Sequence, residues 1–277
     1  MNVVKVYSEV LDKEVLVPEK PVRIVSLAPA ITEILFLLGL KDRIAGVSYF
    51  CNKPEEAKKK PRLGSYFQVN YNKLEELDPD LILVTTGAQR KLALELDEKG
   101  YTVYPIPLPL SIPGIIDMVS QVGIVTGEIE KARLLTEELI IKLSKIPRID
   151  DRLKVYYEID LGGPVSIGSH NYIDDALSRI GLINIFSNIR QTWIINPDPN
   201  EILRRDPQLI LYEKAPYKNY EEEKIIESFK ERGLEKTTAL TNRNIIILEP
   251  DSLAHYGPSI LETLYGIVTR IEETFHP

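Results

Sequence analysis

A twelve-residue pattern occurs twice in this chain, and it constrains the fold more than any other feature. Residues 72–83 and 200–211 both begin with Asn, carry Asp-Pro in the seventh and eighth places, and end with Leu-Ile-Leu. In each copy a short stretch with helical apolar spacing leads into an apolar run typical of a buried strand. The repeat therefore predicts two related lobes, each built around a sheet.

Strands and helices are expected to alternate along the rest of the chain. Apolar runs indicate strands at 22–27, 44–47, 81–85, 102–106, 155–159, 209–212 and 245–248. Helical spacing indicates helices between them, at 34–40, 89–99, 115–125, 174–180 and 258–275. This alternation is typical of α/β proteins with parallel sheets.

One longer helix is expected in the middle of the chain, over residues 128–146. Its apolar residues recur at helical spacing, and Pro147 ends it. We therefore predict an α/β fold of two Rossmann-like lobes with mostly parallel sheets, joined by a single long backbone helix. The predicted division is an N-terminal lobe at 1–126, a linking helix at 127–147 and a C-terminal lobe at 148–277.

Composition excludes several classes of function. The formal net charge of -7 and the lack of a basic stripe argue against nucleic acid as a partner. A lone cysteine, Cys51, cannot form an internal disulfide, and three histidines are too few for a histidine-rich metal site. Nucleotide-binding, zinc-protease and serine-hydrolase motifs are absent from the sequence. We therefore predict no catalytic residues, no resident metal and no cofactor.

Several stretches, in order and at consistent spacing, resemble one protein family. They are residues 21–33, 46–48, 63–66, 77–82 and 256–259. Together they resemble the class III periplasmic substrate-binding proteins of ABC importers for cobalamin, haem and ferric siderophores, and look closest to the vitamin B12-binding proteins. The resemblance runs from about residue 5 to 275, and includes an opening hairpin over residues 7–18.

The resemblance implies a binding protein that carries a metal chelate in a cleft between its lobes and delivers it to an ABC permease. Cobalamin is the first expectation, with haem and ferric siderophores next, and the protein is expected to be a monomer. It would be extracytoplasmic if a signal segment had been removed. Because Met1–Val10 has no signal-peptide pattern, a cytoplasmic corrinoid carrier or sensor is an alternative, and a chelatase-like enzyme is a second one.

The ligand site is expected to combine aromatic walls with a few polar groups, as a broad apolar disc with polar edges requires. By resemblance Tyr66 is an aromatic contact, and Trp193 is close to its counterpart in the second repeat. Asp251 and His255 stand where related carriers have Asp and Arg, and Tyr66 or His255 could ligate a chelate metal. The candidate ligand-binding residues are Pro29, Ala30, Tyr49, Tyr66, Phe67, His170, Trp193, Asp251, His255 and Tyr256.

Docking to the permease is the point at which the sequence departs from the family pattern. Family members use one glutamate on each lobe, and these positions hold Asn72 and Asn200 here. Glu75 and Glu201 lie nearby and could take over the role, because charge complementarity sets encounter rate and register.

Overall fold

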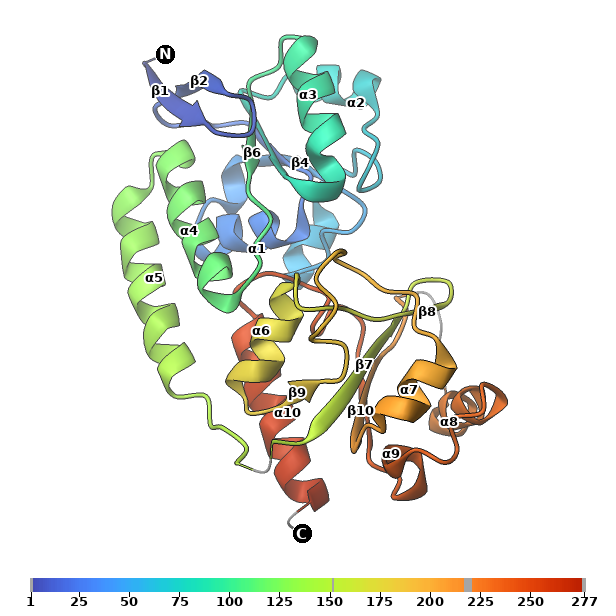
Figure 1. Ribbon diagram of the computed structural model, residues 1–277. Coiled ribbons are helices and arrows are strands. Elements are labelled where there is room, and N and C mark those ends of the chain that lie inside the picture. The colour runs from blue at the N-terminus through green and yellow to red at the C-terminus, as the bar shows by residue number, and fades with distance from the viewer. Residues whose placement is uncertain (1, 151, 217–220, 276–277) are drawn as a thin grey trace. The chain divides into compact units, whose positions relative to one another are not determined.

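The computed structural model describes residues 2–150, 152–216 and 221–275 (Figure 1). The chain divides into two compact units. The first consists of Met1–Pro109, Pro113–Ser144 and Tyr256–Pro258, and the second of Leu110–Ile112, Lys145–His255 and Ser259–Pro277.

The first unit is organised by a parallel sheet with the strand order β4-β3-β5-β6. Its strands are β3 (Ile24–Ser26), β4 (Ile44–Val47), β5 (Leu81–Thr85) and β6 (Val103–Ile106). Strands β3 and β5 are entirely buried, which explains their uninterrupted apolar sequence. A separate antiparallel hairpin pairs β1 (Val3–Ser8) with β2 (Lys13–Pro18), so the hairpin that the resemblance implied over residues 7–18 begins earlier, at Val3.

Helices of the first unit follow its strands. They are α1 (Pro29–Leu37), α2 (Tyr71–Leu77), α3 (Arg90–Glu98), α4 (Ile112–Thr126) and α5 (Ile129–Ser144), with 3-10 turns η1 (Lys41–Arg43), η2 (Glu55–Lys59) and η3 (Gly87–Gln89). Figure 1 shows α4 and α5 running side by side. Gly123 permits this contact, because a Cβ there would lie 2.2 Å from the Cβ of Ala132.

The second unit repeats the parallel arrangement. Its sheet has the order β11-β10-β7-β8, and β9 also pairs with β7. The strands are β7 (Lys154–Asp160), β8 (Pro164–Val165), β9 (Ile183–Asn184), β10 (Leu209–Glu213) and β11 (Ile245–Leu248), and only the pairing of β7 with β8 is antiparallel among those described. The helices are α6 (Tyr172–Arg179), α7 (Pro199–Arg205), α8 (Glu222–Glu231), α9 (Thr238–Thr241) and α10 (Ile260–Phe275).

The two copies of the sequence repeat have the same local structure. Helices α2 and α7 are each seven residues long, and the side chains of Asn70 and Asp198 cap their N-termini. Both helices end at an aspartate in the left-handed conformation, with φ 42° at Asp78 and 45° at Asp206. A buried parallel strand follows each one. The predicted helix–turn–strand repeat is thus confirmed.

Two predicted helices had inaccurate bounds, and two short strands were missed. The helix expected at 34–40 begins at Pro29, because proline is well suited to the first helical turn. Helix α5 is shorter than the predicted 128–146, although it lies inside the proposed linking segment 127–147. Strands β8 and β9 were not predicted, since two residues are too few to show a periodicity. No helix among the described residues is long and apolar enough to cross a membrane.

Candidate functional site

An aromatic cluster lies at the carboxyl edge of the first unit's sheet. The rings of Phe50 and Phe67 meet Tyr66 edge-on, with centroid distances of 6.4 Å and 5.6 Å. Phe67 is 64% exposed, and Tyr49 next to Phe50 is also exposed. Ligands of open α/β sheets bind at this edge, so the cluster offers an apolar surface where a ligand is expected. The predicted contacts Tyr49, Tyr66 and Phe67 are therefore brought together.

A chain of hydroxyl groups fixes the polar end of Tyr66. Its oxygen lies 2.6 Å from that of Tyr256 and 3.1 Å from Oγ1 of Thr85. Gln89 sets the direction of the bonds, because its Nε2 donates to the carbonyls of Leu27 and Tyr66, which leaves Oε1 to accept from Thr85. Thr85 therefore accepts from a tyrosine hydroxyl, with Tyr66 at 3.1 Å and Tyr256 at 3.4 Å both within reach.

This arrangement disfavours Tyr66 as a metal ligand in its present position. Burial raises the pKa of Tyr66, and the hydrogen bonds to Thr85 and Tyr256 offset that rise only in part. As a phenolate ligand, Tyr66 would also lose the proton with which it takes part in the hydrogen bonds to Thr85 and Tyr256. Metal ligation by Tyr66 remains a prediction, and hydrogen bonding is the role that the geometry favours.

The loops that carry the cluster are held by a half-buried arginine and a glycine. Nη1 of Arg62 donates to the carbonyls of Ser48 and Cys51 at 2.6 Å and 3.0 Å, on either side of Tyr49 and Phe50. Gly64 has φ 151°, and a Cβ there would lie 2.2 Å from the carbonyl oxygen of Gln68. A larger residue at position 64 would therefore displace the turn that presents Tyr66 and Phe67.

Pro29 and Ala30 form the first turn of α1, directly after β3. Ala30 is fully buried and Pro29 partly so. The preceding residue, Ala28, provides no side-chain cap, and the hydroxyl of Thr32 donates to Ser26 instead. Contact of Pro29 and Ala30 with a ligand remains a prediction that rests on the position of this turn.

Trp193 and His170 lie together in the second unit. Their rings meet edge-on with centroids 5.4 Å apart. The amide of Asn171 donates to the carbonyl of Trp193 at 3.0 Å, and Ser166 and Ile195 exchange two backbone hydrogen bonds. The segment that carries the single tryptophan is thus tied to the chain following β8, which limits the positions that the indole can reach.

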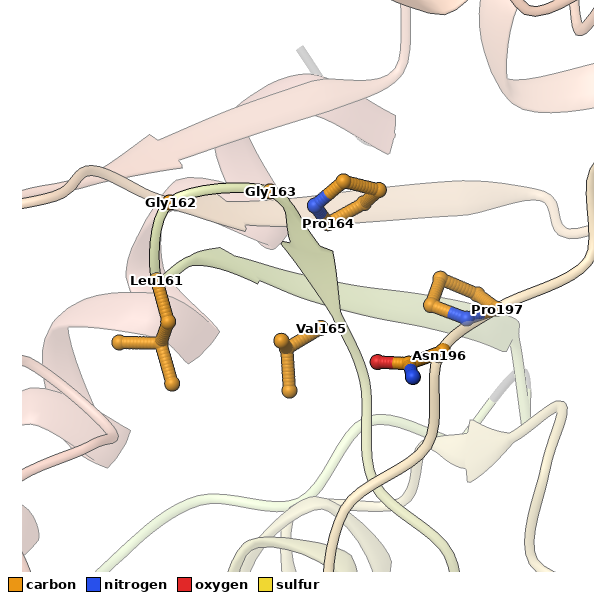
Figure 2. Close-up of a pocket in the computed structure, with 7 residues that line it drawn as sticks. All are labelled: Leu161, Gly162, Gly163, Pro164, Val165, Asn196 and Pro197. Carbon is orange, nitrogen blue, oxygen red and sulfur yellow. The ribbon is translucent and has the colours of Figure 1, made fainter.

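A hollow that the sequence did not predict lies beside this segment. Figure 2 shows the turn between β7 and β8 with Leu161 and Val165 extending to the same side, and Asn196 and Pro197 on the neighbouring segment. The hollow has a volume of about 390 Å³. Its residues Leu161-Gly162-Gly163-Pro164 carried a turn signal, but turn signals do not distinguish a hollow from an ordinary loop.

The loop after β11 carries the remaining predicted contacts. Asp251 is half-buried and adopts a left-handed φ of 60°. His255 is only 4% exposed and Tyr256 is also buried. The hydroxyl of Tyr172 donates to the carbonyl of Leu253 at 2.7 Å. Direct contact between the His255 imidazole and a ligand remains a prediction, and the burial of the side chain does not favour it.

The predicted docking residues lie on the two repeat helices. Asn72 and Glu75 are exposed on α2, and Asn200 is exposed at the start of α7. Glu201 forms ion pairs with Arg204 and Arg205, which lower the pKa of its carboxyl group. Within the described residues, no group of three or more His, Cys, Asp or Glu side chains could hold a metal ion.

Comparison with known proteins gives a family match over most of the chain. A family described as "Periplasmic binding protein" matches residues 24–252. An uncharacterized ABC transporter substrate-binding lipoprotein, YvrC of Bacillus subtilis, is 24% identical over 96% of this chain and 83% of its own. A cobalamin-binding protein of Halobacterium salinarum is 24% identical over 93% of this chain and 70% of its own.

A solved structure shows the same fold. The periplasmic heme-binding protein RhuT from Roseiflexus sp. RS-1, in its apo form, superposes with a TM-score of 0.79 and 22% identity, covering 91% of this chain and 98% of that chain. The predicted class of fold is confirmed by this likeness.

Proposed function

Since the chain belongs to the periplasmic binding protein family, we propose that it is the substrate-binding component of an ABC importer and that it binds cobalamin. The family consists of transport components without catalytic activity, so the ligand is bound and released unchanged. The relatives include cobalamin-binding and haem-binding proteins, which supports a metal chelate as the class of ligand.

The observation that carries the proposal is the aromatic cluster of Phe50, Tyr66 and Phe67. Large planar chelates have broad apolar faces and polar edges, which match exposed rings next to a few fixed polar groups. Phe67 provides the most exposed ring, and the Tyr66 hydroxyl is fixed by its neighbours. Contact of Trp193 with the ligand remains a prediction from the sequence.

Cobalamin is favoured over haem by the state of Tyr66. Haem commonly needs a ligand for its iron from the protein, and a tyrosine would supply it as a phenolate. The pKa of Tyr66, which burial raises, and the engagement of its hydroxyl with Thr85 and Tyr256 oppose that role. A corrinoid that carries its own axial ligands needs no such group.

We propose an extracytoplasmic location and docking of an ABC permease through α2 and α7. The lipoprotein relative supports the location. On α2 the exposed Glu75 and Glu76 provide negative charge. On α7 the arginine partners of Glu201 reduce the local negative charge, so the first unit would provide most of the charge complementarity.

Isothermal titration calorimetry with cyanocobalamin, hemin and a ferric siderophore tests the proposal. We expect a saturable 1:1 complex with cyanocobalamin and weaker or no binding of the other two. Hemin binding that is lost in Tyr66→Phe would instead assign the site to haem with a phenolate ligand. Absence of binding to all three chelates would refute the proposed ligand class.

A further inference from the structure

A buried carboxylate holds the loop that follows β11. Glu213, the last residue of β10, has no exposed surface. Oε1 accepts from the backbone N–H of Ser252 at 3.0 Å, and Oε2 accepts from that of Leu253 at 2.9 Å. The N–H of Ala254 lies within 3.2 Å of both oxygens. Three consecutive amides of the loop thus converge on one side chain.

A fourth donor comes from the neighbouring strand. The hydroxyl of Tyr157 on β7 donates to Oε2 of Glu213 at 2.9 Å. Burial raises the pKa of Tyr157 well above its ordinary value, so the phenol keeps its proton. Four donors and a carboxylate form a satisfied network, which is the condition under which a buried charge can be accommodated.

We propose that Glu213 is a positioning residue for ligand binding, which fixes the loop Asp251–Tyr256 in the conformation that presents its polar groups. The proposal rests on the proposed function, because it assigns a purpose to a loop that contains three of the candidate ligand contacts. The left-handed φ of Asp251 is consistent with a loop whose conformation is imposed by such a network.

Titration of Glu213 gives a signature that packing alone would not produce. Burial raises its pKa to about 7, the hydrogen bonds from Leu253, Tyr157 and Ala254 oppose the rise, and the charge of Asp251 adds to it. The residue that follows Glu213, Lys214, forms an ion pair with Glu249. When the loop opens, Glu213 meets water and its pKa returns toward 4.5.

The sign of the expected pH effect follows from these two values. The closed loop holds the proton more tightly than the open loop, so lowering the pH favours the closed state. Between pH 8 and pH 6 the closed state should gain about tenfold over the open state. A neutral side chain at position 213 removes this dependence.

Amide hydrogen exchange of residues 252–254, expressed as protection relative to an unstructured peptide at the same pH, tests the positioning role without any ligand. In the unmodified protein, protection should rise about tenfold from pH 8 to pH 6. It should be independent of pH in Glu213→Gln and strongly reduced in Glu213→Ala. The matched control is Glu249→Gln, an exposed carboxylate beside the same loop, which should change neither value. His255→Gln should retain the pH dependence, which separates the carboxyl group from the imidazole.

Binding of cyanocobalamin at pH 8, followed by calorimetry, tests the link to the ligand. Affinity should fall at least about tenfold in Glu213→Ala, in line with the loss of a buried charged acceptor, and stay unchanged in Glu249→Gln. Unchanged affinity in Glu213→Ala despite a loosened loop would overturn the proposal, as would pH-independent protection in the unmodified protein. If Glu213→Ala does not fold, the test is the pH dependence of amide protection at residues 252–254, compared between the unmodified protein and Glu213→Gln. If the unmodified protein binds no chelate, the proposed function fails, while the exchange data still report on the loop.

Discussion

The hydroxyl oxygens of Tyr66 and Tyr256 lie 2.6 Å apart, although 190 residues separate them in the sequence. Both residues belong to the first unit, which the chain re-enters at Tyr256. Tyr66 also bonds to Thr85, the last residue of β5. The hydroxyl groups of Tyr66, Tyr256 and Thr85 therefore form one hydrogen-bonded network beside the aromatic cluster.

A double-mutant cycle on Tyr66→Phe and Tyr256→Phe should show coupling. Each single change removes one member of a partly buried hydrogen bond and should lower the free energy of unfolding by about 1 kcal/mol. The double change should cost less than the sum of the two, because the second removal no longer leaves a partner unsatisfied. Urea unfolding checks this, and strictly additive losses would argue against the bond.

Phe67→Ala should weaken ligand binding while leaving stability nearly unchanged. The ring is 64% exposed, so its removal costs little folding energy, while loss of an aromatic contact typically lowers affinity by about 1 kcal/mol or more. The matched control is Tyr265→Ala, because Tyr265 on α10 is similarly exposed at 56% and lies outside the site. Equal affinity losses in the two variants would contradict the assignment of Phe67.

Arg232→Ala should strongly destabilise the protein. Arg232 donates from Nη1 and Nη2 to the two carboxylate oxygens of Glu158 at 2.8 Å and 2.9 Å, and Glu158 is buried. Removing one partner of such a pair leaves an uncompensated charge and costs about 3–5 kcal/mol. Denaturant unfolding measures the loss. The control is Arg204→Ala in the exposed pair with Glu201, which should cost less than about 1 kcal/mol.

Stability should depend on pH through Glu213. Because its pKa in the folded state, about 7, exceeds the ordinary value of 4.5, the group's contribution is fully present below pH 4.5 and is lost as the pH rises through 7. The free energy of unfolding of the unmodified protein, relative to Glu213→Gln, should fall by about 2–3 kcal/mol between pH 5 and pH 8. A difference that is constant over this range would show that Glu213 titrates normally.

The sequence predicted the elements that have a strong local signal. The repeated Asp-Pro pattern located α2, α7 and the strands that follow them, because an aspartate that ends a helix and a buried apolar run can both be recognised locally. Helix α1 starts before the predicted residue 34, and Ala28 has no capping side chain to mark its true start. Such boundaries depend on backbone geometry more than on residue type.

The sequence allowed individual side chains of the candidate site to be predicted, but not the hydrogen bonds that connect them. Tyr66 stood out through the family resemblance, and Trp193 through its place before the second repeat, close to the counterpart of Tyr66. Gln89 and Glu213 did not, because their partners come from distant segments. A glutamate at the end of the apolar run Leu209–Tyr212 was a signal that could have been used, since a buried carboxylate requires partners.

Fluorescence of Trp193 is the most direct test of the central claim that this protein binds a metal chelate. Trp193 is the only tryptophan in the chain, so its emission reports on one surface. The emission is titrated with cyanocobalamin, with free N-acetyltryptophanamide correcting for absorbed light. We predict saturable quenching with 1:1 stoichiometry, lower affinity in Phe67→Ala and unchanged affinity in Tyr265→Ala. Corrected emission that does not change with cyanocobalamin, or with hemin and a ferric siderophore in its place, would contradict the account.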